Sequence, residues 1–358
     1  MSTTPSAETS QHSTSIARNS VRQIGIRQRS LRRHCRLGRA TELVFILVTG
    51  ATLALSGEAD AQTWDGGALT TDWSTAANWN NDAVPLAGDT VTIAGAGGAN
   101  QPNVNTNQTV TQTNVSAGTL SVTATLTSPV TVTGTGNLNI LAAGGVVGNV
   151  AAGGATVSNA GGITGNLSVT AGVVDNSDTV SGTTTVSGGT LNLEAGSNLA
   201  DNQALTVNGG TVNVNASDTV GSLGGTGGTV DIDGPQKLTV GGNNTSTTYS
   251  GDIAGTGTLT KMGTGTLTLD GANSSTGTMD VLFGQVAVTG AGTVNTGTIH
   301  IGGAGTFTAD GGALAGSNAV YGNGQLNITG DETIENMFDF IGDTDIGAGA
   351  TLTLAGNA

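Results

Sequence analysis

Aromatic residues are scarce in this sequence, at 3% of its 358 residues, and none occurs between Trp79 and Tyr249. A compact globular domain relies on aromatic and large branched side chains to fill a thick core. Over that stretch of the chain, only Val, Leu, Ile and Ala are available for burial. The shortage therefore argues against one thick core and favours thin layers of aliphatic side chains that are repeated many times.

Cysteine and basic residues are nearly absent beyond the N-terminal region. The single cysteine is Cys35, and eight of the ten basic residues are arginines before residue 40. After residue 61, only Lys237 and Lys261 are basic. Four of the 25 acidic residues lie before residue 62, so 21 remain and the net charge of this part is −19. These absences exclude disulfides, thiolate metal sites and, without a basic patch, nucleic-acid binding.

The first 61 residues have the pattern of an extended signal peptide. Their arginines precede an apolar run at 43–55, which is followed by a small-x-small site that ends at Ala61. This run is shorter than the ~20 residues that a membrane-spanning helix needs. We expect cleavage between Ala61 and Gln62. The alternative is a buried helix behind a disordered tail.

Groups for catalysis are few after residue 61. His300 is the only histidine there, and no Gly-x-Ser-x-Gly sequence occurs, so a Ser-His-Asp site lacks its parts. Asp231 and Asp233 flank one residue of an expected strand and point to the same face. Such a pair serves glycoside hydrolysis or cation binding, although two solvated acids are the simpler interpretation. Asp343 and Asp345 are weaker candidates for calcium. We expect no enzyme activity, cofactor or metal.

Short alternating segments follow one another from residue 100 to residue 358. Each has the order polar–apolar–polar–apolar, which is the signal of a half-buried strand. Glycine-containing turns precede most of them, since glycine supplies the positive φ of sharp corners. The pattern occurs at residues 119–122, 137–140, 190–193, 211–214, 229–232, 285–288, 325–328 and 351–354.

The spacing of these segments predicts the architecture. Gly-Gly-Thr units begin at Gly188, Gly209 and Gly227, which are 21 and 18 residues apart. At ~3.3 Å per strand residue, such a period fits one coil of about three short strands. Stacked coils form parallel sheets around a ladder of aliphatic side chains. We therefore predict an all-β fold, a parallel β-helix over 100–358, with the right-handed sense that parallel crossovers favour.

Two stretches fit the repeat less well. Residues 141–166 are rich in Gly and Ala, and they predict either narrow coils or a loose insertion. Residues 337–341 form a short apolar patch in an acidic segment. The length of this patch favours an irregular coil over a helix that binds a partner.

Residues 62–99 differ from the repeats and contain all three tryptophans, Trp64, Trp73 and Trp79. The first coil of a solenoid needs a cover, because an open end exposes the core and unpaired strand edges. We interpret 62–99 as an N-terminal cap whose core is formed by the tryptophans. The alternative is that the tryptophans are exposed and bind sugars.

The most regular repeat lies at 250–288. A Gly-Thr-Leu-Thr unit at 257–260 recurs at 265–268, and a Gly-Thr-x-x-Val segment follows at 277–281. This block resembles the autotransporter-associated β-strand repeat, also called the passenger-associated transport repeat, and 62–93 is similar to the start of related surface proteins. The positions that match the repeat motif are Gly257, Leu259, Lys261, Gly263, Gly265, Leu267, Leu269, Gly271 and Asn273.

The resemblance implies a right-handed β-helical passenger that is exported through the periplasm and displayed on, or released from, the bacterial outer membrane. In that family, the repeat is thought to assist passenger folding and transport. Such passengers usually continue into a membrane β-barrel with alternating strands and aromatic girdles. Residues after 288 lack that pattern, so we expect a translocator barrel to come from a longer chain or from another protein.

These observations together favour a structural, adhesin-like module of a cell surface. Its expected partners are a glycan or protein of a host or cell surface and the translocator barrel. The first alternative is a β-helical carbohydrate-active enzyme of the glycoside hydrolase type that uses paired carboxylates. The second is a folding and transport element without any ligand.

Overall fold

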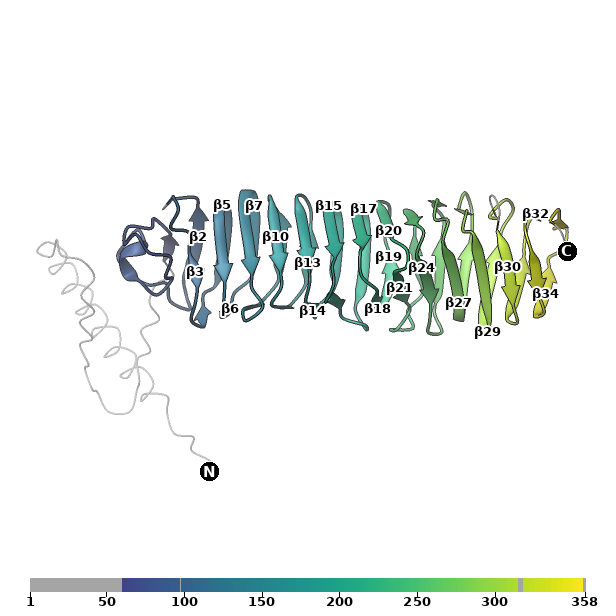
Figure 1. Cartoon of the computed structure of the whole chain (residues 1–358), viewed down its shortest axis with the longest axis horizontal. Coiled ribbons are helices and arrows are strands. Elements are labelled where there is room, and N and C mark those ends of the chain that lie inside the picture. Colours follow the sequence, from purple (N-terminus) through teal and green to yellow (C-terminus); the bar gives the residue numbers. More distant parts are fainter. Residues whose placement is uncertain (1–59, 97, 315–317, 357–358) are drawn as a thin grey trace, which may run out of the picture. The chain divides into compact units, whose positions relative to one another are not determined.

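The computed structural model describes residues 60–96, 98–314 and 318–356, which belong to one compact unit. Figure 1 shows their strands side by side in a long stack of coils. Every strand ladder within these ranges is parallel, and the coils form a β-solenoid of about 13 turns. The predicted all-β parallel solenoid is therefore confirmed, and its right-handed sense stays a prediction. Of the expected signal peptide, 1–61, all but the last two residues lie outside the described ranges.

The strands form three large sheets and two small ones. The 14-stranded sheet comprises β1 Ala61–Thr63, β2 Thr90–Ala94, β3 Asn103–Val104, β5 Gln112–Val122, β7 Val130–Ile140, β9 Val150–Gly153, β10 Thr156–Asn159, β12 Leu167–Val169, β13 Val173–Asn176, β15 Thr184–Leu193, β17 Ala204–Val214, β19 Ser222–Gly224, β20 Thr229–Ile232 and β23 Asp252–Gly255. The six-stranded sheet comprises β4 Gln108–Thr109, β6 Thr125–Thr127, β8 Gly145–Val147, β11 Ile163–Thr164, β14 Thr179–Val180 and β16 Asn198–Leu199.

The 11-stranded sheet continues the solenoid toward the C-terminus. It comprises β18 Asp218–Val220, β21 Lys237–Val240, β22 Thr247–Tyr249, β24 Thr258–Lys261, β25 Thr266–Leu269, β27 Thr278–Val288, β29 Thr298–Ala309, β30 Ala319–Gly322, β31 Gln325–Ile328, β33 Phe338–Phe340 and β34 Asp343–Ile346. The two small sheets pair β26 Ala272–Asn273 with β28 Thr293–Val294, and β32 Glu332–Ile334 with β35 Leu352–Leu354. One short 3₁₀ helix, η1, spans Ala76–Asn78.

The register between coils places each inward side chain above its counterpart in the next coil. One such ladder passes through eight successive strands, and all its members are at most 2% exposed. Its members are Leu120, Leu138, Val157, Val174, Leu191, Val212, Val230 and Ile253. Each buried aliphatic side chain contributes ~1.5–3 kcal/mol. The core is therefore a stack of thin aliphatic layers, as the shortage of aromatic residues predicts.

The longest strands turn a corner at a glycine. In β7, residues 130–133 pair with β9 and residues 137–140 pair with β10, so the strand contributes to two faces of the coil. Gly134 lies between these halves with a φ of +57°, and a Cβ there would approach the carbonyl oxygen of Ser116 to 2.8 Å. Both the positive φ and the nearby backbone require glycine at this corner.

The two irregular stretches of the sequence belong to regular coils. Strands β8 to β11 lie within 141–166 and pair in register with the coils on both sides. The interpretation of this stretch as a loose insertion is therefore wrong, and small residues simply form a narrow coil. The patch at 337–341 contains β33, which pairs with β30 in parallel, so it is part of a coil as expected.

The tryptophans form the core of the N-terminal end. Trp64, Trp73 and Trp79 are at most 1% exposed, and Trp79 packs edge-to-face on the other two with ring centroids 5.1 and 4.7 Å apart. The indole N–H groups of Trp64 and Trp79 donate to the carbonyl oxygens of Asn100 and Trp73. Because the rings are enclosed, they form a core at this end, and the alternative in which the tryptophans are exposed is wrong.

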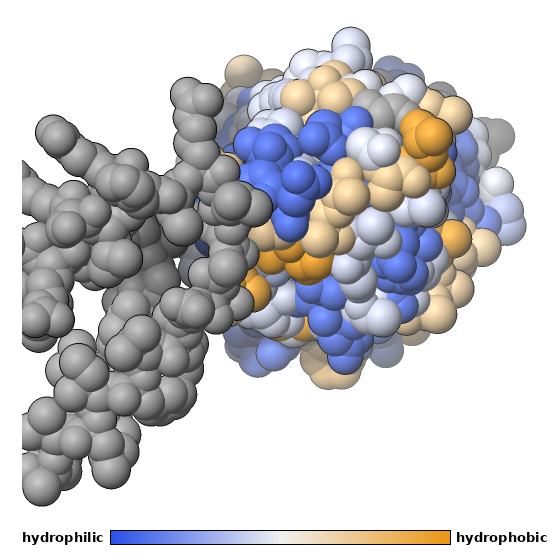
Figure 2. All heavy atoms as spheres, turned by 90° about the vertical axis from the view of Figure 1, so that its left-hand side faces the viewer, coloured by the Kyte–Doolittle hydropathy of each residue, from blue (hydrophilic) through white to orange (hydrophobic). Residues whose placement is uncertain are grey.

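The outer surface of this end is mixed in polarity. Figure 2 views this end, and apolar residues appear there as separate spots among polar ones. Strands β1 and β2 already belong to the main sheet, and β2 pairs with β5 of the next coil. The segment 62–99 thus both covers the first coil and supplies strands to it.

Removing the central ring of the tryptophan cluster should destabilise this end alone. We expect Trp79→Ala to cost about 3–5 kcal/mol locally, because it deletes a fully buried aromatic side chain that supports two others. Amide hydrogen exchange in β1 and β2 measures this loss, and Leu69→Ala is the control, since Leu69 is 78% exposed. Unchanged protection of β1 and β2 in Trp79→Ala would contradict the role of the cluster as the cap core.

Candidate functional site

The motif at 257–273 comprises β24, β25 and β26 and the two coil corners that join them. Leu259 in β24, and Leu267 and Leu269 in β25, point inward and are almost fully buried. The motif glycines Gly263 and Gly265 lie against the backbone of the coil before, where a Cβ would collide with the carbonyl groups of Gly241 and Thr245 respectively. Gly257 and Gly271 are restricted by the backbone in the same way.

Lys261 is the only charged residue among the nine positions that match the motif, and its side chain is buried in the solenoid. It is 2% exposed and lies in register between Val240 and Val281, at a position that the coils on either side fill with valine. Its Nζ donates to the carbonyl oxygens of Met262, Gly263 and Phe283 at 2.6, 3.0 and 3.4 Å.

The surroundings of Lys261 determine its chemistry. Burial lowers the pKa of its ammonium group to about 8. No carboxylate is paired with it among the described residues, and carbonyl dipoles of the corner solvate the charge instead. Three acceptors hold the ammonium group in place, so it presents no reactive group to a ligand. We call a buried polar side chain that binds backbone groups of neighbouring coils in this way a clamp.

Asn273 is a second clamp at the end of the motif. Its side chain is 2% exposed, and its Oδ1 accepts the backbone N–H of Ile253 in the preceding coil at 3.1 Å. Its Nδ2 donates to the carbonyl oxygens of Gly271 and Thr293, the latter in the following coil. One amide therefore links three coils, which explains why the motif has asparagine at this place.

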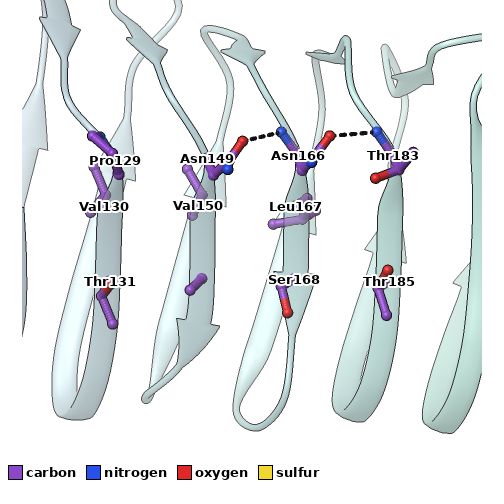
Figure 3. Close-up of a pocket in the computed structure, with 11 residues that line it drawn as sticks. Pro129, Val130, Thr131, Asn149, Val150, Asn166, Leu167, Ser168, Thr183 and Thr185 are labelled. Carbon is purple, nitrogen blue, oxygen red and sulfur yellow. Dashed lines mark hydrogen bonds between the residues drawn. The ribbon is translucent and has the colours of Figure 1, made fainter.

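A shallow hollow lies on one face of the solenoid, whose stack of coils we call the shaft, across β7, β9, β12 and β15 (Figure 3). Thr131, Ala151, Ser168 and Thr185 form an outward row there, because the four strands pair in register. At its edge, the Oδ1 atoms of Asn149 and Asn166 each accept a backbone N–H of the next coil at 2.9 Å. All residues that line the hollow are uncharged, so it offers hydrogen bonds but no acid, base or strong nucleophile.

Asp231 belongs to β20, whereas Asp233 lies beyond the end of this strand, so the strand pattern places only Asp231 on the outer face. Burial raises the pKa of Asp231, and the charges of Asp233 and then Asp252 raise it further. Asp231 ends an outward row in which the amide of Asn213 donates to the Oδ1 of Asn192 at 2.8 Å. The amide of Asn192 in turn donates to the Oδ1 of Asp175 at 2.7 Å.

The remaining predicted positions lie on the surface or at the start of the fold. Asp343 and Asp345 are exposed on β34, and the described residues contain no group of three or more His, Cys, Asp or Glu side chains arranged to hold a metal. His300 lies on β29, and its Nδ1 is 3.4 Å from the Oδ1 of Asp280. Ala61 and Gln62, the expected cleavage position, both lie in β1, and the Gln62 side chain is buried.

Two buried carboxylates are clamps that the sequence pattern does not reveal. Asp218 accepts the backbone N–H groups of Leu199 and Thr219, and Glu332 accepts those of Ala313 and Leu314. Burial raises the pKa of both groups, and the hydrogen bonds from the backbone oppose this rise. Each carboxylate ties its own coil to the previous one. A polar residue at an apolar ladder position is the only sequence signal for Glu332.

Comparison with protein-family models, with curated proteins and with solved structures finds no match to this chain. Among the residues 60–356 that are described, no helix is long and apolar enough to span a membrane. The fold and the side chains of this chain are therefore what indicates its function.

The buried ammonium of Lys261 should make stability rise with pH. Its pKa is lowered in the folded state, so the unfolded chain binds more protons between pH 8 and 10.5 and folding is favoured as pH increases. We expect the free energy of unfolding to rise by about 1.5 kcal/mol from pH 8 to 9.5. Urea unfolding followed by circular dichroism measures this change.

Variants of the two lysines separate this effect from other titrations. Lys261→Met should lose the rise, whereas Lys237→Met should keep it, because Lys237 is exposed on β21. An equal rise in the wild type and in Lys261→Met would contradict the assignment.

Replacing Asp231 by asparagine should stabilise the shaft. The new amide can donate to Asn213 and extend the row of amides, and it removes repulsion with Asp233 and Asp252. We expect a gain of about 0.5–1.5 kcal/mol for Asp231→Asn near pH 7. The gain should shrink toward pH 3.5, because a carboxyl with a raised pKa favours the folded state at low pH and loses that contribution as pH rises.

Thermal unfolding at both pH values tests this expectation. Asp233→Asn is the matched control, since it removes the same charge from an exposed position outside the strand. A loss of stability in Asp231→Asn at pH 7 would show that the carboxylate itself is required.

Proposed function

We propose that the chain is an exported structural module, the β-solenoid shaft of a bacterial cell-surface or secreted protein with adhesin-like binding on its outer faces. The observation that carries this proposal is the uninterrupted stack of about 13 coils. The stack begins directly after a signal-like sequence and is covered at that end by the tryptophan cluster. A shaft of this kind holds its outer faces at fixed spacing, which suits display.

The placement of the acidic residues supports a module without catalysis. Asp231 ends a row of amides, and Asp233 lies beyond the strand, so their surroundings resemble an outer face of the shaft. The hollow on the β7–β15 face is lined by uncharged residues only. We therefore place the glycoside hydrolase alternative second, and loss of polysaccharide cleavage in Asp231→Asn would support that alternative.

The surroundings of Lys261 and Asn273 favour a folding role for the 250–288 block within the same module. Both side chains are buried and bind backbone groups of neighbouring coils. Such clamps fix the register between coils. A parallel solenoid needs this register because each new coil must align with the previous one as the chain folds. This role accompanies that of the shaft and needs no ligand.

Export is tested with the full chain and its natural N-terminus, expressed in a Gram-negative bacterium. We expect the recovered product to begin at Gln62 by intact mass, and to be found in the periplasmic fraction or, where a translocator barrel is supplied, at the cell surface or in the medium. As a control, a variant with the apolar run at 43–55 deleted should stay in the cytoplasm. Recovery of the wild-type chain in the cytoplasm with residues 1–61 still attached would contradict the proposal.

A further inference from the structure

One row of outward side chains breaks the threonine pattern of the shaft. On the 11-stranded sheet, the row begins with Thr219, Thr239 and Thr260. In the next four coils, the same position is occupied by Asp280, His300, Tyr321 and Asp339. The four side chains point away from the core, so packing does not require this change. Positions that depart from a repeat without a structural need are candidates for function.

The side chains of this row contact one another along the shaft. His300 lies between Asp280, 3.4 Å from its Nδ1, and Tyr321, whose ring stacks on the imidazole at a centroid distance of 4.7 Å and an angle of 20°. Asp339 continues the row beyond Tyr321 and is exposed. Because the rings stack along the axis, they present their edges outward, with the Tyr321 hydroxyl group and the imidazole edge available for hydrogen bonds.

We propose that Asp280, His300, Tyr321 and Asp339 form a binding site for a neutral sugar chain that lies along the shaft. Carboxylates accept hydrogen bonds from sugar hydroxyl groups, and the phenol and imidazole groups both donate and accept them. In the coils beside Asp280 and His300, the adjacent outward row carries hydroxyl groups at Thr258, Thr278 and Thr298. The face as a whole therefore matches a ligand that is covered with hydroxyl groups.

Charge selects among sugar polymers. Residues 262–358 contain nine acidic residues and no lysine or arginine. Their field repels uronic acids and sulfated chains. A basic peptide would be attracted by this field. However, His300 already lies against the carboxylate of Asp280, so only the carboxylate of Asp339 is left in the row to pair with a basic side chain. Hydrogen bonding to neutral hydroxyl groups uses the whole row.

The length of the row favours binding over cleavage. Asp280 and Asp339 are three coils apart, or ~14 Å at the usual strand spacing. The two carboxyl groups of glycoside hydrolases lie about 5–9.5 Å apart. The two acids are therefore too distant to act on one glycosidic bond, and a ligand that reaches both must be a chain of several sugars.

The test uses the purified full chain and three soluble neutral polymers, namely dextran, laminarin and yeast mannan. Affinity electrophoresis measures retardation of the protein by each polymer. We expect retardation by at least one of them, which persists in 1 M NaCl, where the Debye length is about 3 Å. Tyr321→Phe and Asp339→Asn should each weaken this binding about tenfold, since the first removes a hydroxyl group and the second replaces a carboxylate acceptor by an amide donor. Thr268→Ala, on the outward side of β25, should leave it unchanged.

Three results would overturn the site. The first is that none of the three polymers retards the protein. The second is that Tyr321→Phe and Asp339→Asn leave the retardation unchanged. The third is that the protein binds only poly-L-lysine and that this binding is lost in 1 M NaCl. Tyr321→Phe keeps the ring stack, so a loss of binding with an unchanged circular dichroism spectrum reports on the hydroxyl group. The inference rests on the proposed function for the exposure of this face. Export and binding are measured separately, so failure of one is distinguishable from failure of the other.

Discussion

The in-register stacking of parallel coils is the constraint on which the rest of this structure depends. Each inward position must fit the same position in the coils before and after it, so the ladders consist of side chains of similar size. Each coil contacts mainly its neighbours, and its stability comes from these two interfaces. A chain with few aromatic residues can satisfy this constraint, because the ladders are built mainly from aliphatic side chains.

The corners are the costly part of such a fold. Their backbone groups cannot all pair within sheets, and buried polar groups without partners cost about 1–3 kcal/mol each. Glycine brings neighbouring corners close enough to pair, as at Gly134 and Gly263. Buried polar side chains satisfy other groups: Asn273, Glu332 and Lys261 all bind backbone atoms. The same device recurs with an amide, a carboxylate and an ammonium group, which shows that the requirement is for hydrogen bonds and not for one kind of charge.

The sequence predicts the architecture well because the two signals it carries are strong. Alternation of polar and apolar residues identifies strands, and the spacing of Gly-Gly-Thr units gives the coil length. The strand at 190–193 and its counterparts at 211–214 and 229–232 pair as this spacing predicts. The narrow coil at 141–166 was harder to predict, because alanine and glycine give little alternation. The cap was predictable because three tryptophans in an otherwise aromatic-poor chain had to be buried together.

The sites were less predictable, since they depend on register across coils. The burial of Lys261 follows from its inward position two residues after Leu259, but the carbonyl groups that surround it come from two coils, at 262–263 and at Phe283. The row that contains His300 and Tyr321 joins residues about 20 apart in sequence, and no local motif marks it. Such rows become visible only when the pairing of every strand is known.

The enclosure of all three tryptophans in the first coil has a consequence for spectroscopy. Indole emission from this protein originates entirely from the N-terminal end, and the long shaft contributes none. A fluorescence transition therefore reports the opening of one end, whereas far-ultraviolet circular dichroism reports the whole stack. The two signals form a natural pair of local and global probes, and the separation between their midpoints measures how independently the first coils open from the rest.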